Sequence, residues 1–207
     1  MLFELHAHTR EHSPCSKVSA VELVTAAIAK GLDGLVLTDH HYLWSMEEIQ
    51  SLRSATAAPM SFMLAAGQEV TTSDMGDVLV YGAPVTIGPG HRLRELRLDF
   101  PEVAIVLAHP WRGQNRPSMV ELFDPNIDAV EVLNRHHRFS KNRRALREWF
   151  TWGFVAIGGT DSHDHNVGIY PTAFPDGVNT MSGVVDSIKA GTCRPLLKSK
   201  RYRHFIS

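Results

Sequence analysis

Short apolar runs that end in histidines or carboxylates recur along this chain and constrain its fold more than any other feature. Residues 34–37 and 103–107 are continuously apolar, which is typical of strands buried on both faces of a parallel sheet. A histidine follows each of these runs within three residues, at His40 and His109. Because the carboxyl ends of parallel strands meet at one end of a barrel or one edge of a sheet, we expect such side chains to converge.

The first apolar run, residues 2–5, leads directly into His6 and His8. On an extended strand, residues two apart point to the same side, so both imidazoles face one space. Two imidazoles at the end of a short strand are an efficient start to a metal site. Histidine is also the unusual part of the composition, because ten of its 12 copies fall in five tight places: His6, His8 and His12; His40 and His41; His109; His136 and His137; and His163 and His165.

Periodicity and turn residues divide the rest of the chain into alternating strands and helices. Strands are predicted at residues 2–8, 34–37, 62–66, 78–81, 103–107, 129–133 and 155–157, the fourth as a return strand after a turn. Helices are predicted at residues 20–30, 45–55, 93–98, 119–123, 141–152 and 183–189. Ser19 is a plausible N-cap, and Ser45 with Glu48 matches a capping box.

Buried strands that alternate with helices predict parallel β-α units with right-handed crossovers. An open doubly wound sheet would gather its ligands at one switch point. Here ligand-type residues follow six different strands, which favours a β/α barrel with its site at the carboxyl ends of the strands.

The bulk properties exclude several classes of protein. The 207 residues, 43% of them apolar, fit one domain spanning residues 1–207. A net charge of −1 argues against a general nucleic-acid or membrane-surface binder. No apolar run is long enough to span a bilayer, no signal peptide is evident, and two cysteines make no disulfide framework. We therefore expect a cytoplasmic protein.

The candidate metal ligands share imidazole or carboxylate chemistry and strand-end or nearby loop positions: His6, His8, Cys15, His40, Glu69, Asp77, His109, Asp161 and His163. Imidazole with carboxylate suits zinc, manganese or iron rather than calcium or magnesium. One zinc ion takes about three protein ligands and a water, so nine candidates suggest two or three ions. Ions held close together need a bridging carboxylate, for which Glu69 or Asp161 could serve.

Each candidate also has an ordinary explanation. His40 alone could be a hydrogen-bonded loop histidine, Glu69 a surface carboxylate, and Asp161 the N-cap of a helix. Ligand types at the ends of most strands are hard to explain as independent accidents, and together they favour a metal cluster.

Five motifs occur in the order found in the PHP family, which is named after polymerase and histidinol phosphatase: Glu4-Leu5-His6-Ala7-His8-Thr9, Thr38-Asp39-His40, Gly67-Gln68-Glu69-Val70-Thr71-Thr72, Ala108-His109-Pro110 and Gly159-Thr160-Asp161-Ser162-His163. The resemblance covers residues 2–171. It implies an α/β fold, a distorted (β/α)7 TIM-like barrel, with two or three metals and usually phosphoester hydrolysis.

The resemblance also distributes the ligands. His6 and His8 would hold a first metal together with Glu69 and Asp161. Glu69 would bridge to a second metal, which His109 would bind.

A third metal would be held by His40 and His163. Two positions depart from the commonest family pattern. Cys15 stands where an aspartate or histidine usually serves the third metal, and Asp77 where a histidine often serves the second; both can ligate, although Cys15 could also be a structural thiol. Glu4 stands where an aspartate is usual, and we expect it to orient an imidazole.

The expected reaction is hydrolysis of a phosphate ester by a hydroxide that bridges two metals. Arg112 and Arg135 follow predicted strands and could clamp phosphate, although each could equally be a solvent-facing loop residue. Arg116, His136 and Lys141 are weaker candidates. The catalytic acid is not assigned, since metal-bound water or His136 could protonate the leaving group.

Two other functions remain open. An amidohydrolase-type C–N hydrolase also begins with a His-x-His strand, but many members bridge their metals with a modified lysine at a strand end, and no lysine here occupies one. The alternative without catalysis is a metal-stabilised PHP module. The expected substrate is a small phosphorylated molecule, with nucleic acid considered only as a short oligonucleotide, because the basic residues 143–147 and 198–203 look like a solvated helix face and a short tail.

Overall fold

The helices begin where local side chains satisfy their first backbone N–H groups. The structure, a computed structural model, describes residues 1–113 and 116–196. In α2 (Met46–Thr56), Oγ of Ser45 accepts from the amide of Glu48, whose carboxylate accepts from the amide of Ser45. This confirms the predicted capping box, and Ser19 starts α1 (Ala20–Ala29) in the same way. The remaining helices are α3 (Leu93–Asp99), α4 (Met119–Leu122), α5 (Phe139–Trp152) and α6 (Met181–Lys189).

Within the described residues, nine strands form the sheet, in the order β7-β6-β5-β4-β3-β2-β1-β8-β9. They are β1 (Leu2–Glu4), β2 (Gly34–Leu37), β3 (Met63–Thr72), β4 (Gly76–Tyr81), β5 (Ala104–Leu107), β6 (Ala129–Leu133), β7 (Ala156–Gly158), β8 (Thr172–Ala173) and β9 (Arg194–Pro195). The pairs β1–β2, β2–β3, β5–β6 and β6–β7 are parallel.

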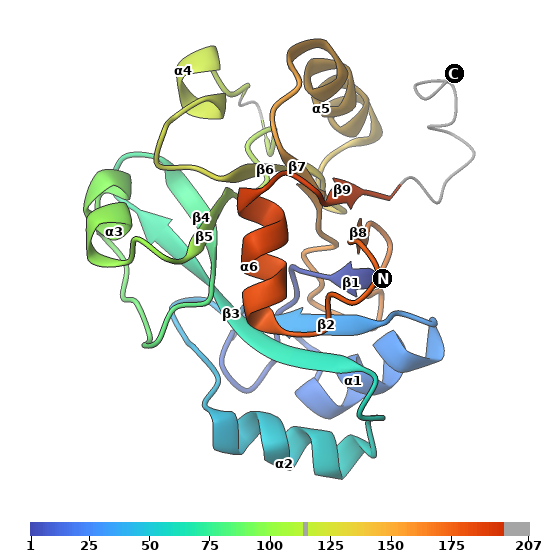
Figure 1. Cartoon of the computed structure of the whole chain (residues 1–207). Helices are drawn as coiled ribbons and strands as arrows, with labels where there is room; N and C mark the ends of the chain where they lie inside the picture. The colour runs from blue at the N-terminus through green and yellow to red at the C-terminus, as the bar shows by residue number, and fades with distance from the viewer. Residues whose placement is uncertain (114–115, 197–207) are drawn as a thin grey trace.

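The sheet curves into a nearly closed barrel (Figure 1). Past the end of β1, Ala7 forms a parallel bridge with Ser162, which follows β7. Near the other end, the hydroxyl of Thr172 in β8 donates to the carbonyl of Gly158 in β7, and β9 lies beside β7. This architecture confirms the predicted α/β barrel class.

Three details differ from the sequence-based expectation. β4 pairs antiparallel with β5, although a parallel β-α unit was expected there, whereas its antiparallel pairing with β3 confirms the predicted return strand. β3 continues to Thr72, so Glu69 lies inside a strand and not at its end, because the β3–β4 hairpin extends the ladder past the barrel. Asp77 accordingly lies in β4 and not in a loop. The predicted basic tail at residues 198–203 is outside the described residues.

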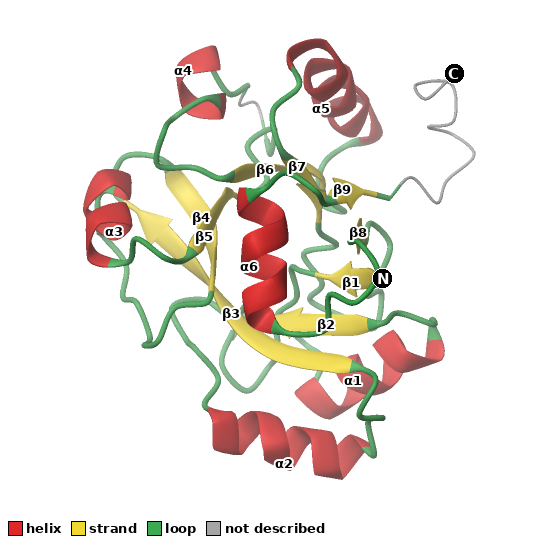
Figure 2. Ribbon diagram, viewed as in Figure 1, coloured by secondary structure: helices red, strands yellow, loops and turns green. Residues whose placement is uncertain are grey.

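Apolar clusters lie inside the barrel and on both of its flanks. Inside, Phe3 and Val106 pack with Val184 and Ile188 of α6, which covers the end at which the parallel strands begin. Outside, α1 and α2 pack along one side of the strands, and α3, α4 and α5 along the other (Figure 2). The carboxyl ends of the strands are left for polar side chains. Within the described ranges, no helix has both the length and the apolar character needed to cross a membrane.

Candidate metal centre

Backbone pairing at the carboxyl ends of the strands gathers the candidate ligands. The amide of His8 donates to the carbonyl of Ser162 (2.8 Å), and the amide of Ser162 donates to the carbonyl of His6 (3.2 Å). This pairing places the His-x-His segment beside Asp161. A second bridge joins His40 to Glu69, so the loop after β2 meets β3 at the same end of the barrel.

The side chains that converge there form four sets, and within each set the donor atoms all lie within 4.8 Å of one another: His6, Glu69 and His109; His6, His8 and Asp161; His8, His40 and His163; and His136, Asp161 and His163. Seven of these eight residues are predicted ligands. His136 was expected only as a weak candidate for binding phosphate or for the acid.

Glu69 is the centre of this arrangement. Its Oε2 lies 3.1 Å from Nε2 of His8 and 3.1 Å from Nδ1 of His40, whereas its Oε1 lies 2.9 Å from Nε2 of His109. The two oxygens of one carboxylate therefore face two different sets of imidazoles. Such a carboxylate can bridge two cations.

Two other predicted ligands lie at the edge of the cluster. Asp77 Oδ2 is 4.0 Å from Nε2 of His109, and its Oδ1 accepts a hydrogen bond from Thr71. Cys15 is exposed and belongs to none of the four sets. Partial burial raises the pKa of its thiol, and the negative charges of Glu69 and Asp161 add to this shift. The thiolate that a metal would require is thus disfavoured without a cation.

The predicted phosphate-binding arginines have different surroundings. Nη1 of Arg112 lies 3.8 Å from Oδ2 of Asp161, and the side chain is half exposed. Arg135 forms a bidentate ion pair with Asp164, at 2.6 and 2.9 Å. The planar guanidinium of Arg135 is therefore already engaged by a carboxylate, whereas that of Arg112 faces the cluster and solvent. Nε2 of His136 lies 2.9 Å from the carbonyl of Asp161.

The buried negative charges of the cluster favour the binding of cations. Burial by itself raises the pKa of Glu69 and Asp161, but the neighbouring imidazoles, above all His6, hold both pKa values below their usual range. Burial likewise opposes protonation of His6, yet Glu131, Asp161 and Glu69 raise its pKa well above the usual value. The buried carboxylates thus depend on positive charge at this position.

The donor set also fits divalent metals. Nε2 of His6 and Nε2 of His8 face each other at 3.1 Å, as expected of nitrogens directed at a common point. Burial lowers the pKa of His40 and His163, which favours the neutral imidazole that a metal ligand must be. Imidazoles and carboxylates are both ligands of divalent metals.

Glu131 is a functional residue that the sequence reasoning missed. Its Oε1 lies 2.9 Å from Nδ1 of His6, and its Oε2 accepts from the amide of His109 and from Asn134. It therefore orients one imidazole and the backbone of another. The available signal was a charged residue in the middle of the otherwise apolar strand β6.

Glu4 was expected to orient an imidazole, and this expectation is wrong. Its carboxylate accepts from the amide of His6, from the amide and hydroxyl of Thr160, and from the amide of Gly168. Because both oxygens are taken by these donors, Glu4 fixes the backbone around β1 and β7. The imidazole of His6 is left to Glu131.

Asp39 is a second residue that was missed. It accepts from the amide and hydroxyl of Thr9, the hydroxyl of Ser13 and the indole of Trp44. Oγ of Ser13 in turn lies 3.3 Å from Nδ1 of His8. This network fixes the loop after β1 against β2, and the position of Asp39 two residues after a buried strand could have revealed it.

Two members of the cluster have strained backbones. His109 and Asp161 have positive φ angles of 32° and 54°, a region that side chains other than glycine seldom adopt. Strained residues persist only where surrounding structure holds them, and they concentrate at functional sites. Here the amide of His109 is held by Glu131, and the carbonyl of Asp161 lies near two imidazoles.

Comparisons with known proteins agree with this fold. The sequence matches no protein-family profile and no curated protein. Among solved structures, PsfC from Pseudomonas syringae PB-5123 is similar with a TM-score of 0.71 and 16% identity, over 99% of this chain and 94% of that chain. A putative metal-dependent phosphoesterase from Bifidobacterium adolescentis is similar with a TM-score of 0.59 and 16% identity, over 81% of this chain and 91% of that chain.

An amidohydrolase from Chromobacterium violaceum, solved with bound sulfate and no metal, is also similar, with a TM-score of 0.55 and 14% identity over 96% of this chain and 99% of that chain. At these identities the likeness establishes a shared fold. The class defined by fold and site is thus a β/α barrel with a histidine- and carboxylate-rich cluster at the carboxyl ends of its strands. The phosphoesterase among these neighbours agrees with the PHP-family resemblance of the five motifs.

Proposed function

We propose that this protein is a single-domain, metal-dependent phosphoesterase that hydrolyses a small phosphate ester. The observation that carries the proposal is the position of Glu69, whose two oxygens face separate sets of imidazoles. The fold shared with a putative metal-dependent phosphoesterase supports it. The metals are two or three divalent ions of zinc, manganese or iron.

The roles of the ligands follow from their grouping. Glu69 would bridge the first two ions, with His6, His8 and Asp161 on one side and His109 on the other. His40 and His163 would hold a third ion, with Asp77 and Cys15 as the proposed additional ligands of the second and third sites. Such ions supply Lewis acidity and a water of lowered pKa.

The protein itself orients the substrate. Arg112 lies close enough to Asp161 to donate to a phosphoryl oxygen at the cluster. His136, exposed at the mouth and within reach of Asp161 and His163, remains the candidate for moving a proton to the leaving oxygen. Arg135, already paired with Asp164, would hold the loops that carry these residues.

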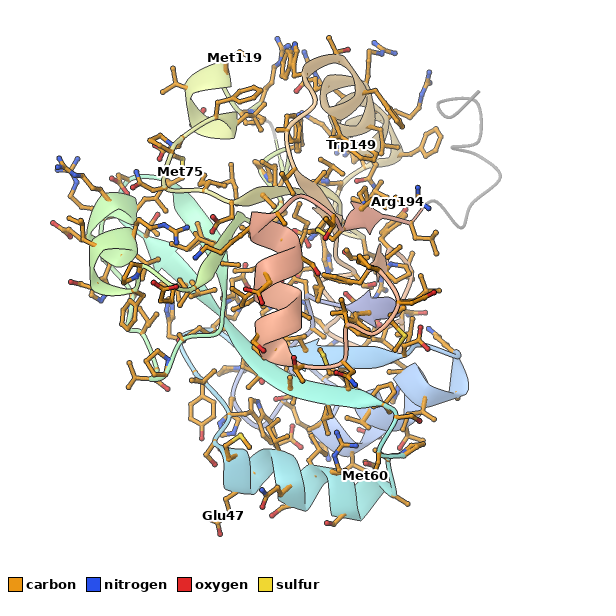
Figure 3. The ribbon with its side chains drawn as sticks, viewed as in Figure 1. Glu47, Met60, Met75, Met119, Trp149 and Arg194 are labelled. Carbon is orange, nitrogen blue, oxygen red and sulfur yellow. The ribbon has the colours of Figure 1, made fainter. Side chains whose placement is uncertain are left out.

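The test combines metal content with turnover. Purified protein would be subjected to elemental analysis and to a phosphate-release screen with manganese, zinc and iron. We expect Glu69→Ala to abolish phosphate release and to lower the number of bound ions. Glu47→Ala is the control, because Glu47 is exposed on α2 and belongs to no donor set (Figure 3). Unchanged metal content and turnover in Glu69→Ala would refute the bridging role.

Hydrolysis of a C–N bond is the second candidate, and the amidohydrolase among the structural neighbours supports it. The lysines within the described ranges lie in helices or loops and not on strands: Lys17, Lys30, Lys141 and Lys189. No strand lysine is therefore available there as a modified bridge. A screen of amides alongside phosphate esters separates the two functions, and turnover of amides alone would replace the phosphoesterase proposal.

A further inference from the structure

A cavity of about 520 Å³ opens beside the metal centre. Its walls come from the start of β4, the end of β5, the loop that follows β5, and α4. Asp77 and His109, which lie at the cluster, also line this cavity, as does Arg112. The volume is within the range of about 300–1,000 Å³ typical of small-molecule sites. A substrate held at the metals would therefore extend into it. Met75, on its wall, and Met119 of α4 mark this side of the molecule in Figure 3.

The cavity is lined by a second guanidinium in addition to that of Arg112. Arg116 lines the cavity, and its Nε lies 3.1 Å from Oε1 of Glu148 in α5. The same oxygen accepts from Nε of Arg144 at 3.1 Å, and the other oxygen accepts from the indole of Trp111. The single negative charge of the buried Glu148 is thus paired with two guanidiniums, those of Arg116 and Arg144, and one positive charge is left without a partner charge. Among the described residues, the Nη atoms of Arg116 have no hydrogen-bond partner.

The acidic residues on the lining do not cancel this charge at Arg116. Glu121 accepts from the amide of Ser118 and so caps the start of α4. Asp77 accepts from Thr71 and faces His109. The Nη donors of Arg116, whose side chain is half exposed, are consequently available to an anionic ligand that enters the cavity, and guanidinium donors of this planar form bind carboxylate or phosphate oxygens.

We propose that the cavity takes the leaving group of the substrate, and that this group carries a second anion which Arg116 binds. The inference rests on the proposed phosphoesterase function and narrows its substrate class to phosphate esters with a further carboxylate or phosphate. In the reaction, the oxygen of water bonds to phosphorus and the bond to the leaving oxygen breaks. The leaving oxygen takes the proton that this water gives up, and the anionic end of the leaving group remains on Arg116. Glu148 acts as the positioning residue for Arg116.

The experiment compares matched pairs of phosphate esters that differ in the second anion. Glycerol 3-phosphate and 3-phosphoglycerate differ by a carboxylate, and fructose 6-phosphate and fructose 1,6-bisphosphate by a phosphate. We expect the metal-loaded protein to prefer the doubly anionic member of at least one pair in kcat/KM by about tenfold, as for one charged hydrogen-bonded contact. In Arg116→Ala this preference should vanish, through a higher KM for that member and an unchanged rate for the other.

Arg144→Ala is the matched control. Arg144 contacts the same oxygen of Glu148 at the same distance but does not line the cavity. The control variant should keep the preference, and thermal unfolding of both variants shows whether either is misfolded. Equal kcat/KM within both pairs, or equal loss for all four esters in Arg116→Ala, would overturn the second-anion site and leave the phosphoesterase proposal standing.

The binding of the same four compounds, measured by calorimetry, tests the anion site independently of whether the protein hydrolyses them. If no ester is hydrolysed with any metal, the phosphoesterase function is wrong. Tighter binding of a doubly anionic compound that Arg116→Ala removes would still establish the anion site. Equal binding of all four compounds by wild type and Arg116→Ala would overturn it.

Discussion

Oε1 of Glu131 lies 2.9 Å from Nδ1 of His6, and both side chains are fully buried. The other oxygen of Glu131 accepts from the amide of His109. One carboxylate in β6 therefore aligns two candidate ligands that are expected on different metals. Carboxylates in this position fix the tautomer of a ligating histidine and raise its basicity.

Glu131→Gln should weaken metal binding without emptying the site. The amide keeps the shape of the side chain but loses the charge that favours the Nδ1–H tautomer of His6. We expect a loss of about 10–100-fold in metal affinity or activity, measured by competition with a chelator and by phosphate release. The exposed Glu47→Gln should change neither quantity. An unaltered metal affinity in Glu131→Gln would show that the contact has no role in the site.

Gly159 allows this pair to approach closely, and Gly159→Ala should disrupt it. A Cβ at this position would lie 2.0 Å from Oε1 of Glu131 and 2.7 Å from Cβ of His6. Overpacking of a buried position typically costs about 1–3 kcal/mol, so we expect a lower melting temperature and weaker metal binding. Gly88→Ala is the control, because its Cβ would meet no atom within 4 Å. Equal stability of the two variants would contradict the close contact.

The metal-free protein should be most stable between mildly acidic and near-neutral pH. Glu69 and Asp161 have lowered pKa values, mainly through His6 against the effect of burial. Their contribution is present above the unfolded pKa values of about 4 and is lost as the pH falls below them. His6 has a raised pKa because nearby carboxylates outweigh burial. Its contribution is complete below about pH 6.5 and is lost as the pH rises through the raised value.

Thermal unfolding in the presence of a chelator, measured across this pH range, tests the expectation. Saturation with metal should remove the alkaline decline, because metal replaces the proton on His6 and its binding strengthens as imidazoles deprotonate. A metal-free melting temperature that rose steadily into the alkaline range would contradict the assignment of charge to His6.

Substitution of Arg135 tests whether this residue joins two loops or binds the phosphate of the substrate. It was predicted to bind phosphate, but its guanidinium is paired in a bidentate manner with Asp164. If the pair only joins the loops after β6 and β7, Arg135→Ala and Asp164→Ala should each cost about 1 kcal/mol of stability and lower activity alike. The double variant should be no worse than either single one. A loss of activity confined to Arg135→Ala would instead show that it contacts the substrate.

Local patterns were sufficient to predict the elements that depend on neighbours in the chain. The apolar run of β2 has the predicted bounds, and α2 begins at its predicted capping box. Both depend on residues within four positions of each other, where spacing determines geometry. His6 and His8 were expected to share an orientation on a strand that ends at His8. β1 ends at Glu4 instead, and an isolated parallel bridge between Ala7 and Ser162 continues the pairing between the two histidines.

Contacts between distant segments could not be predicted from such local patterns. Glu131 meets His6 across 125 positions of sequence, and only the barrel shows that it, and not Glu4, reaches the imidazole. The pairing of Arg135 with Asp164 likewise depends on which loops become neighbours once β6 and β7 lie side by side. The local sequence determines the strands and the ligand-type residues that follow them. Their assembly into one cluster is decided by the closure of the sheet, since closure alone determines which strand ends face each other.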